Sequence, residues 1–192
     1  MAIYLSKGQK VDLTKENPNL KNILIGIGWN VKSHETEDAL ELDTAVFLCG
    51  ANGKCLASKD FIFYGNLEHD NGSIKHLSDN LKVNGEDDEQ IQVDLSKMDS
   101  STQKIAFAII IYESNTKKQD FRQIEDCFIR IIDESTNTEL LRYEIGGSFS
   151  DETSVVVGEL YRYNGEWKFN AIGSGFTGGL VELCDHYGIK IK

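Results

Sequence analysis

The chain has 192 residues and a mass of 21.5 kDa, which suits one domain with a sizeable core, and its 31 acidic and 20 basic residues give a formal net charge of -11. This charge repels phosphate backbones and anionic lipid, so nucleic acids and membranes are poor partners, whereas cations and basic proteins are better ones. No run approaches the roughly 18 apolar residues of a membrane span, and the start lacks the features of a signal peptide, so we expect a cytoplasmic protein without membrane insertion.

Short apolar runs rich in β-branched and aromatic residues predict strands along the chain. In chain order these runs are 22–29, 45–49, 61–64, 104–112, 128–132, 155–163 and 166–172. The segments 91–95 and 139–145 alternate apolar and polar residues, which predicts strands with one face in water. Asn164-Gly165 separates the last two runs and supplies the positive backbone angles of a tight turn, so these runs form the clearest hairpin.

Helical periodicity is scarce. A terminal helix is predicted over 179–188, with a glycine at its end, and a short helix is expected within 119–127. The side chains expected along one side of the terminal helix are Leu180, Val181, Leu183, Cys184 and Tyr187. Many short strands with few helices predict a mainly all-β fold, an antiparallel β-sandwich of two sheets with a few short helices. With one proline and no low-complexity tract, we expect a single domain over 1–192.

Four cysteines, Cys49, Cys55, Cys127 and Cys184, are spread along the chain. Only the first two are close, and their spacing matches no zinc or redox motif. Because the cytoplasm is reducing, disulfides are disfavoured there. We therefore expect buried free thiols.

The strongest concentration of charge is the run 78–89, which holds five carboxylates, two carboxamides and a glycine. Such oxygen donors suit a hard cation such as calcium, which would offset their mutual repulsion. A second acidic loop spans 30–43 and could meet the first, although both loops could equally be independent solvated surface. The site is not an EF-hand, because aligning Gly85 with the invariant glycine of that loop puts Ile91 where the bidentate glutamate must be.

Signals for catalysis are poor. Glu159 and Glu166 lie on or beside predicted strands and are the candidate carboxylate pair for a hydrolase. Residues 173–178 match G-x-G-x-x-G, but no second parallel strand follows and no acidic residue lies roughly twenty positions on, so these glycines are expected to permit a bend before the terminal helix. We predict a protein without enzymatic activity and without a nucleotide cofactor.

Several segments together resemble the TerD family of tellurite-resistance and stress-response proteins, and the resemblance covers nearly the whole chain. The segments are Leu5-Ser6-Lys7-Gly8, Gly26-Ile27-Gly28-Trp29, Asp60-Phe61-Ile62-Phe63-Tyr64, Phe128-Ile129-Arg130, the hairpin 158–169 and the glycine-rich stretch 173–180. The resemblance implies a β-sandwich that binds calcium, with two ions expected, through loops at one end and without a known enzymatic activity.

The resemblance also implies the ligands. The family's site is marked by an Asp-Asn pair and by a following Asp-Asp-Glu, which match Asp79-Asn80 and Asp87-Asp88-Glu89 here. The family's Gly-Trp-Asp is Gly28-Trp29-Asn30 in this chain. The implied calcium ligands are Asp43, Asn66, Asp79, Asn80, Asp87, Asp88 and Glu89.

The leading hypothesis is therefore a cytoplasmic calcium-binding stress protein whose ordered loops form a surface for a protein partner. A second hypothesis is a metal-independent acidic module that docks a basic protein. A third and weaker one is a calcium-assisted hydrolase or sugar-binding sandwich.

Overall fold

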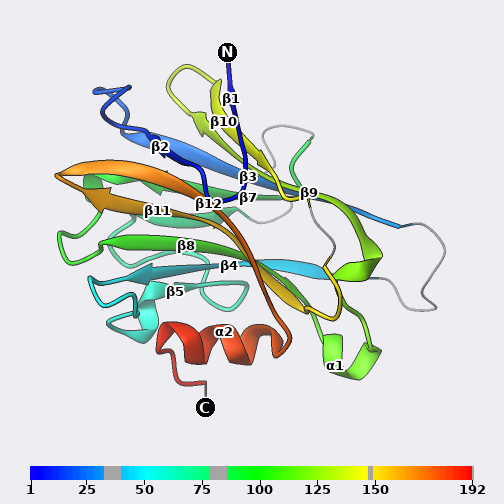
Figure 1. Ribbon diagram of the computed structural model, residues 1–192. Coiled ribbons are helices and arrows are strands. Elements are labelled where there is room, and N and C mark those ends of the chain that lie inside the picture. The colour runs from blue at the N-terminus through cyan, green and yellow to red at the C-terminus, as the bar shows by residue number, and fades with distance from the viewer. Residues whose placement is uncertain (33–39, 78–85, 147–148, 192) are drawn as a thin grey trace.

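The protein, seen here as a computed structural model that describes residues 1–32, 40–77, 86–146 and 149–191, is a sandwich of two six-stranded sheets (Figure 1). Sheet A has the order β1 (Ile3–Leu5), β10 (Thr138–Glu144), β9 (Ile124–Asp133), β3 (Asn22–Val31), β7 (Glu89–Asp94), β6 (Ile74–Leu77). Sheet B has the order β2 (Lys10–Asp12), β12 (Glu166–Phe176), β11 (Ser154–Tyr163), β8 (Lys104–Ile111), β4 (Leu42–Cys49), β5 (Phe61–Ile62). The predicted sandwich is confirmed, with one parallel pair, β1 and β10, among antiparallel ones.

The main core lies between the two sheets. Ile25 and Ile129 face it from sheet A, and Phe107 and Val157 face it from sheet B, all four without exposed surface. Side chains alternate between the two faces of a strand, so the residues between these positions form the outer faces of the sandwich. The two outer faces are covered in different ways.

A helix covers part of the outer face of sheet B. Helix α2 (Gly179–Tyr187) buries Leu183 and Cys184, and the Tyr187 ring stacks on Phe47 with a centroid distance of 4.3 Å. Gly188 ends the helix with a φ of 78°, which a glycine adopts without strain. The terminal helix is confirmed, although Val181 lies on its solvent side and is 61% exposed.

The hairpin of β11 and β12 is also confirmed. Asn164 and Gly165 occupy its turn with φ values of 52° and 80°. The register of the hairpin shifts between Val156 and Gly158, opposite Gly173, whose φ is 68°. A Cβ at Gly173 would lie 2.6 Å from the Tyr143 hydroxyl, so a glycine is favoured in this bulge, which lies inside β12 and not in the bend expected before α2.

The helix predicted within 119–127 is wrong. Its residues form a 3-10 turn, Phe121–Gln123, and then enter β9. The Asp120 side chain accepts a hydrogen bond from the Arg122 backbone N–H at 3.0 Å, which fixes this turn. The pairing of β9 with β3 and β10 then overrides any helical preference.

Two other segments differ from prediction. The strand expected over 61–64 ends at Ile62, because reciprocal backbone hydrogen bonds between Phe63 and Asn66 close a tight turn. Strand β6 lies directly before the acidic run, where the sequence predicted no strand. The remaining short elements are the helix α1 (Ser114–Lys117) and the 3-10 turns η1 (Ser58–Asp60) and η3 (Leu95–Lys97).

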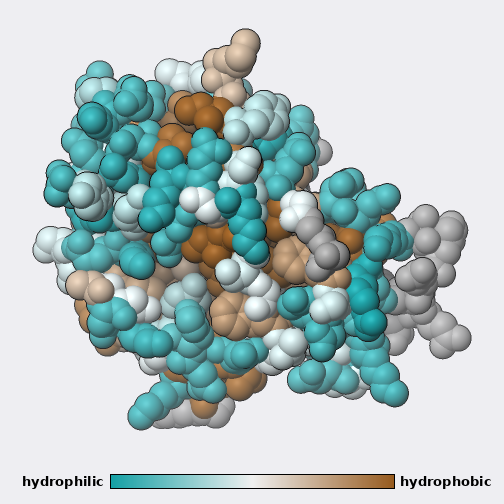
Figure 2. All heavy atoms as spheres, in the orientation of Figure 1, coloured by the Kyte–Doolittle hydropathy of each residue, from teal (hydrophilic) through white to brown (hydrophobic). Residues whose placement is uncertain are grey.

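Hydrophilic side chains cover most of the face seen in Figure 2, with hydrophobic side chains reaching the surface in separate patches. Within the described residues no helix is long and apolar enough to cross a membrane. All four cysteines are free thiols, as expected, but Cys55 is only partly buried.

Candidate functional site

The acidic segment that follows residue 85 is fixed to the outer face of sheet A by a buried ion pair. Asp87 accepts hydrogen bonds from Arg130 Nε at 2.8 Å and from Arg130 Nη2 at 3.0 Å. Gln90 Nε2 donates a third bond, at 2.8 Å, to the same carboxylate. The Asp87 side chain has no exposed surface and that of Arg130 is 8% exposed. This bidentate geometry makes Asp87 an anchor for the segment.

Two glycines of β3 make room for this anchor. A Cβ at Gly26 would lie 2.4 Å from Asp87 Oδ1, and a Cβ at Gly28 would lie 2.4 Å from the Phe128 ring. Both distances are shorter than any ordinary contact, so neither position accepts a side chain without displacing its neighbour. The Gly26-Ile27-Gly28-Trp29 motif therefore provides the surface on which the acidic segment rests.

Further charges extend the cluster around Arg130. Arg142 donates to Glu139 Oε1 at 2.8 Å and to Glu86 Oε2 at 2.8 Å, and Arg130 Nη1 lies 3.1 Å from Glu139 Oε2. Hydrogen bonds from Arg142 hold the pKa of the Glu139 carboxyl below its usual range, although partial burial acts in the opposite direction. We call Glu86, Asp87, Arg130, Glu139 and Arg142 the sheet A ion cluster.

Asp88 lies at the end of β3. Its Oδ2 accepts the Trp29 backbone N–H at 2.8 Å, while its own N–H donates to the Ile27 carbonyl at 2.9 Å. The Asp88 charge and, above all, burial raise the pKa of the Cys127 thiol to about 12. The Asp88 carboxylate is thus held by the backbone beside Asn30, at one end of the sandwich.

Glu89 takes part in a polar contact between the two sheets. Its Oε2 is 3.1 Å from Nε2 of His76, and the same ring nitrogen is 2.7 Å from Oγ1 of Thr44. Thr44 belongs to β4 in sheet B, whereas His76 and Glu89 belong to sheet A. His76 therefore links the acidic segment to β4, the strand that contains Asp43.

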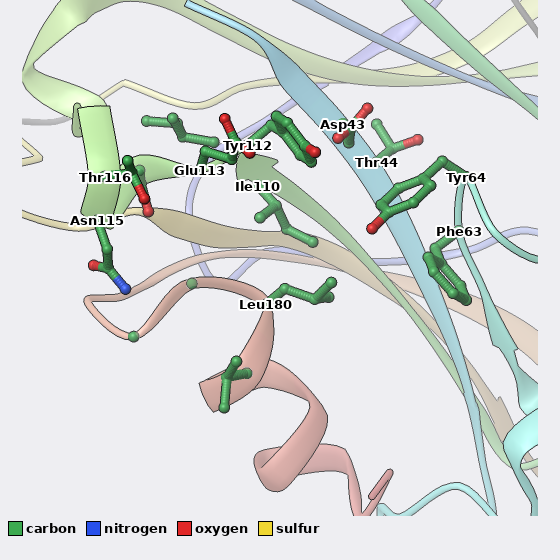
Figure 3. A pocket seen from close by; sticks show the side chains of 15 residues that line it. Asp43, Thr44, Phe63, Tyr64, Ile110, Tyr112, Glu113, Asn115, Thr116 and Leu180 are labelled. Carbon is green, nitrogen blue, oxygen red and sulfur yellow. The ribbon is translucent and has the colours of Figure 1, made fainter. Parts of the chain in front are cut away.

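Asp43 lies on the rim of a pocket at the same end of the molecule (Figure 3). Position 43 is in phase with Ala45 and Phe47, which face α2, whereas Thr44 is in phase with the inner core. The pocket has a volume of about 280 Å³ and is lined mainly by apolar and aromatic side chains. Figure 3 labels Phe63, Tyr64, Ile110, Tyr112, Glu113 and Leu180 around it.

The structure does not bring the described members of the predicted ligand set into one cluster. Asp87 is on the outer face of sheet A, Glu89 is between the sheets, and Asp43 is at the rim of the pocket. Asn66 is in the turn after β5, where its amide donates to the Phe61 carbonyl at 2.8 Å. No group of three acidic, histidine or cysteine side chains in the described part of the chain is arranged to hold a metal ion. Asp79 and Asn80 lie outside the described residues.

The two carboxylates considered for hydrolysis are well separated. Glu159 pairs with Asn170 and Glu166 pairs with Tyr163, four residues along β11. At about 3.3 Å per residue, the backbone positions of the two glutamates are roughly 13 Å apart along the strand. The two carboxyl groups of a glycosidase are only roughly 5–9.5 Å apart. Each already accepts a hydrogen bond, Glu159 from Asn170 and Glu166 from Thr14.

Sequence reasoning missed the basic partners of the acidic segment. Arg130 was noted only as part of a family-like stretch, and His76 was given no role. The available signal was weak: Arg130 is a charged residue in an otherwise apolar run, which requires a buried partner.

Comparisons with known proteins agree with this architecture. The TerD domain model matches residues 1–187. The chain belongs to the TerD family. It is 48% identical over 192 residues to general stress protein 16U of Bacillus subtilis (strain 168), with both chains fully covered. It is 42% identical over 191 residues to the tellurium resistance protein TerD of Serratia marcescens, covering 99% of each.

A solved structure shares the fold of this TerD-family chain. A homologue of telluride resistance protein (TerD) from Streptomyces coelicolor A3(2) superposes with a TM-score of 0.63 at 15% identity, covering 86% of this chain and 95% of the other.

Proposed function

We propose that this TerD-family chain is a calcium-binding, non-enzymatic stress-response protein. One observation carries the proposal: Asp87 locks the acidic segment to Arg130 and so fixes the next two carboxylates, Asp88 at the end of β3 and Glu89 between the two sheets. The names of its relatives, which refer to general stress and tellurium resistance, support the stress-response part.

The donor chemistry fits calcium. Carboxylate and carboxamide oxygens are the ligands of a hard cation, and calcium accepts six to eight of them. The residues that we propose as ligands are Asp43, Asn66, Asp79, Asn80, Asp88 and Glu89; the described ones stand apart in this structure, so binding would have to draw them together. We assign Asp87 the role of an anchor, because both of its oxygens accept strong hydrogen bonds from Arg130. A bound cation would supply the positive charge that lets self-repelling loops adopt one ordered arrangement.

We propose that ordering of the acidic loops prepares a surface for a protein partner. This surface is the pocket beside Asp43. Its rim carries Tyr64 and Tyr112, which are 58% and 38% exposed and meet edge to face. Exposed aromatic side chains around an apolar pocket are typical of protein-binding hot spots. Because Asp43 is both a rim residue and a proposed ligand, calcium would act directly on this surface.

Thermal unfolding tests calcium binding. Calcium at about a hundred times its dissociation constant should stabilise the folded state by roughly 2.7 kcal/mol if it binds only that state. The melting temperature should therefore rise with calcium and fall back when a chelator is added. An unchanged melting temperature over millimolar calcium would refute the proposal.

Matched variants localise the effect. Asp88→Asn keeps an oxygen acceptor for the Trp29 N–H but loses the charge, so we expect weaker calcium stabilisation and nearly unchanged stability in chelator. Glu16→Gln, which removes the same charge, is the control. Glu16 is exposed and precedes the first residue of β3, whereas Asp88 lies at the other end of that strand, so this variant should leave the calcium response unchanged. Equal responses of both variants would place the ion elsewhere.

The second candidate is the metal-independent acidic module. The ion pairing of Asp87 with Arg130 and the contact of Glu89 with His76 favour it, because these carboxylates already have partners within the protein. A fluorescent lysine octapeptide is a suitable probe. For this candidate its binding should weaken with ionic strength but survive chelation, whereas the calcium proposal predicts that chelation changes it.

A further inference from the structure

Two thiols lie against each other at the outer face of sheet B, far from the sheet A ion cluster. Cys49 ends β4, and Cys55 follows a turn of five residues. Their Sγ atoms are 4.0 Å apart. Sequence spacing gave no sign of this contact, because the turn, and not a short motif, brings the two sulfurs together.

The backbone around the pair already has the geometry of a cross-strand disulfide. Cys49 and Cys55 form an isolated antiparallel bridge, and inside it the Gly50 N–H donates to the Lys54 carbonyl at 2.9 Å. This pattern defines a non-hydrogen-bonded pair, whose Cα atoms are typically about 4.5 Å apart with side chains on the same face. Disulfides span Cα separations of roughly 4.4–6.8 Å. Side-chain rotation is therefore enough to bring the sulfurs to bonding distance.

The four cysteines differ in access to solvent. Cys55 is partly exposed, whereas Cys49 is 1% exposed and Cys184, on the buried side of α2, is fully buried. Cys127 belongs to the separate core between the sheets. A reagent in solution therefore reaches Cys55 first, and Cys49 is the thiol in contact with it.

We propose that Cys49 and Cys55 are a reversible dithiol that forms an intramolecular disulfide by exchange with a low-molecular-weight disulfide. The Cys55 thiolate attacks one sulfur of the small disulfide, forms a mixed disulfide and releases one small thiolate. The Cys49 thiolate then attacks Cys55 Sγ, forms the Cys49–Cys55 bond and releases the second small thiolate. The pair loses two electrons and two protons, which reduce the small disulfide to two thiols.

The surroundings make this a slow site that responds to strong oxidation. The contact with Cys49, and then burial, raise the pKa of the Cys55 thiol, so its thiolate is scarce at neutral pH and exchange speeds up as pH rises. The Cys55 N–H also donates to the Tyr187 carbonyl at 2.8 Å. A disulfide would thus tie β4, the turn 50–54 and the end of α2 together.

Mass spectrometry of the full chain tests the proposal. The protein is incubated with oxidised glutathione at pH 7 and pH 9, remaining thiols are blocked with N-ethylmaleimide after unfolding, and the chain is digested with trypsin. Lys54 lies between the two cysteines, so cleavage there leaves a disulfide as the covalent link between their peptides. Before blocking, the intact mass should fall by two hydrogen atoms per chain. After digestion we expect a linked Cys49–Cys55 peptide pair, and this link should form faster at pH 9 than at pH 7.

Single variants test the order of the steps. Cys49→Ala should accumulate a glutathione adduct on Cys55, because the second thiol is missing, and Cys55→Ala should form neither adduct nor link. Cys184→Ser is the matched control and should still form the link. In native protein, N-ethylmaleimide should modify Cys55 at least about tenfold faster than Cys127 or Cys184.

Three outcomes would overturn the proposal: a stable glutathione adduct on Cys55 of the unmutated chain, a link from Cys55 to Cys184, or no oxidation at pH 9. The mapping uses the unmutated protein, so it remains decisive even where an alanine variant fails to fold. Neither reaction nor readout involves calcium, so this result is independent of the proposed metal site.

Discussion

The outer faces of the two sheets are covered by different kinds of contact. Sheet A is covered largely by charge: Asp87 and Arg130 pair with almost no exposed surface, with Glu139 and Arg142 beside them, and a small apolar cluster of Leu24, Leu77 and Ile132 lies on the same sheet. Sheet B is covered by apolar contact, with Leu183 and Tyr187 of α2 packed over Phe47. Charged cover is directional and depends on both partners, whereas apolar cover depends on area and fit.

This difference has functional consequences. The ion pairs on sheet A fix the position of the acidic segment, which we propose binds calcium. Because these contacts are charged, protons and cations can change them. The apolar cover of sheet B shields Cys49 and Cys184 and leaves Cys55 at its edge. One face is thereby suited to respond to ions and the other to oxidation.

The largest effect that separates the two faces is expected from Arg130→Ala. It leaves the Asp87 carboxylate buried without its cation, which should cost about 3–5 kcal/mol of unfolding free energy. Urea denaturation at pH 7 measures it. Removing both partners with Asp87→Ala in the same chain should cost clearly less than the sum of the single changes. Costs that add within about 0.5 kcal/mol would show that the pair is not coupled.

Leu183→Ala tests the apolar cover. The side chain is fully buried between α2 and sheet B, so its truncation should cost about 3 kcal/mol through lost burial and a cavity. This cost should be nearly independent of salt. Val181→Ala, on the exposed side of the same helix, should stay within about 0.5 kcal/mol of the parent. A similar loss for Val181→Ala would mean that the helix is stabilised by something other than this contact.

Gly26→Ala tests the surface beneath the charged cover. The new methyl group would overlap the Asp87 carboxylate, so we expect a loss of about 1–3 kcal/mol and a weaker calcium response, because the acidic segment is pushed away. Gly146→Ala is the control, since nothing lies within 4 Å of a Cβ there. Equal stabilities of the two variants in urea would exclude the overlap.

The sequence predicted the strands well because local signals determined them. Apolar runs, Asn164-Gly165 and the terminal Gly188 each have a short-range physical reason, and each is where it was expected. The failures come from long-range pairing. Residues 124–127, where a helix was expected, join β9 because β3 lies beside them, and no local pattern encodes that neighbour.

The same limit applies to the sites. Charge density identified the acidic segment, but only the fold shows that Asp87 faces Arg130, 43 residues away, while Glu89 faces His76. Likewise, the contact of Cys49 with Cys55 depends on a turn closed by a backbone hydrogen bond. The residue types in the sequence predicted the kind of chemistry at each site. Which residues contact one another could be learned only from the three-dimensional structure.

The smallest effect is the acid sensitivity of the charged cover. Because Arg142 lowers the pKa of folded Glu139 below the ordinary value of 4.5, the stabilisation from this carboxylate is fully present above pH 4.5 and is lost as pH falls through the lowered pKa. Glu139→Gln should therefore cost about 1 kcal/mol or less at pH 7, since the group is partly solvated. The difference from the parent should shrink towards pH 3. Urea denaturation at pH 7, 5, 4 and 3 measures it, with Glu16→Gln as a control that should give no such trend; a constant difference for Glu139→Gln would mean that Arg142 does not favour the ionised form.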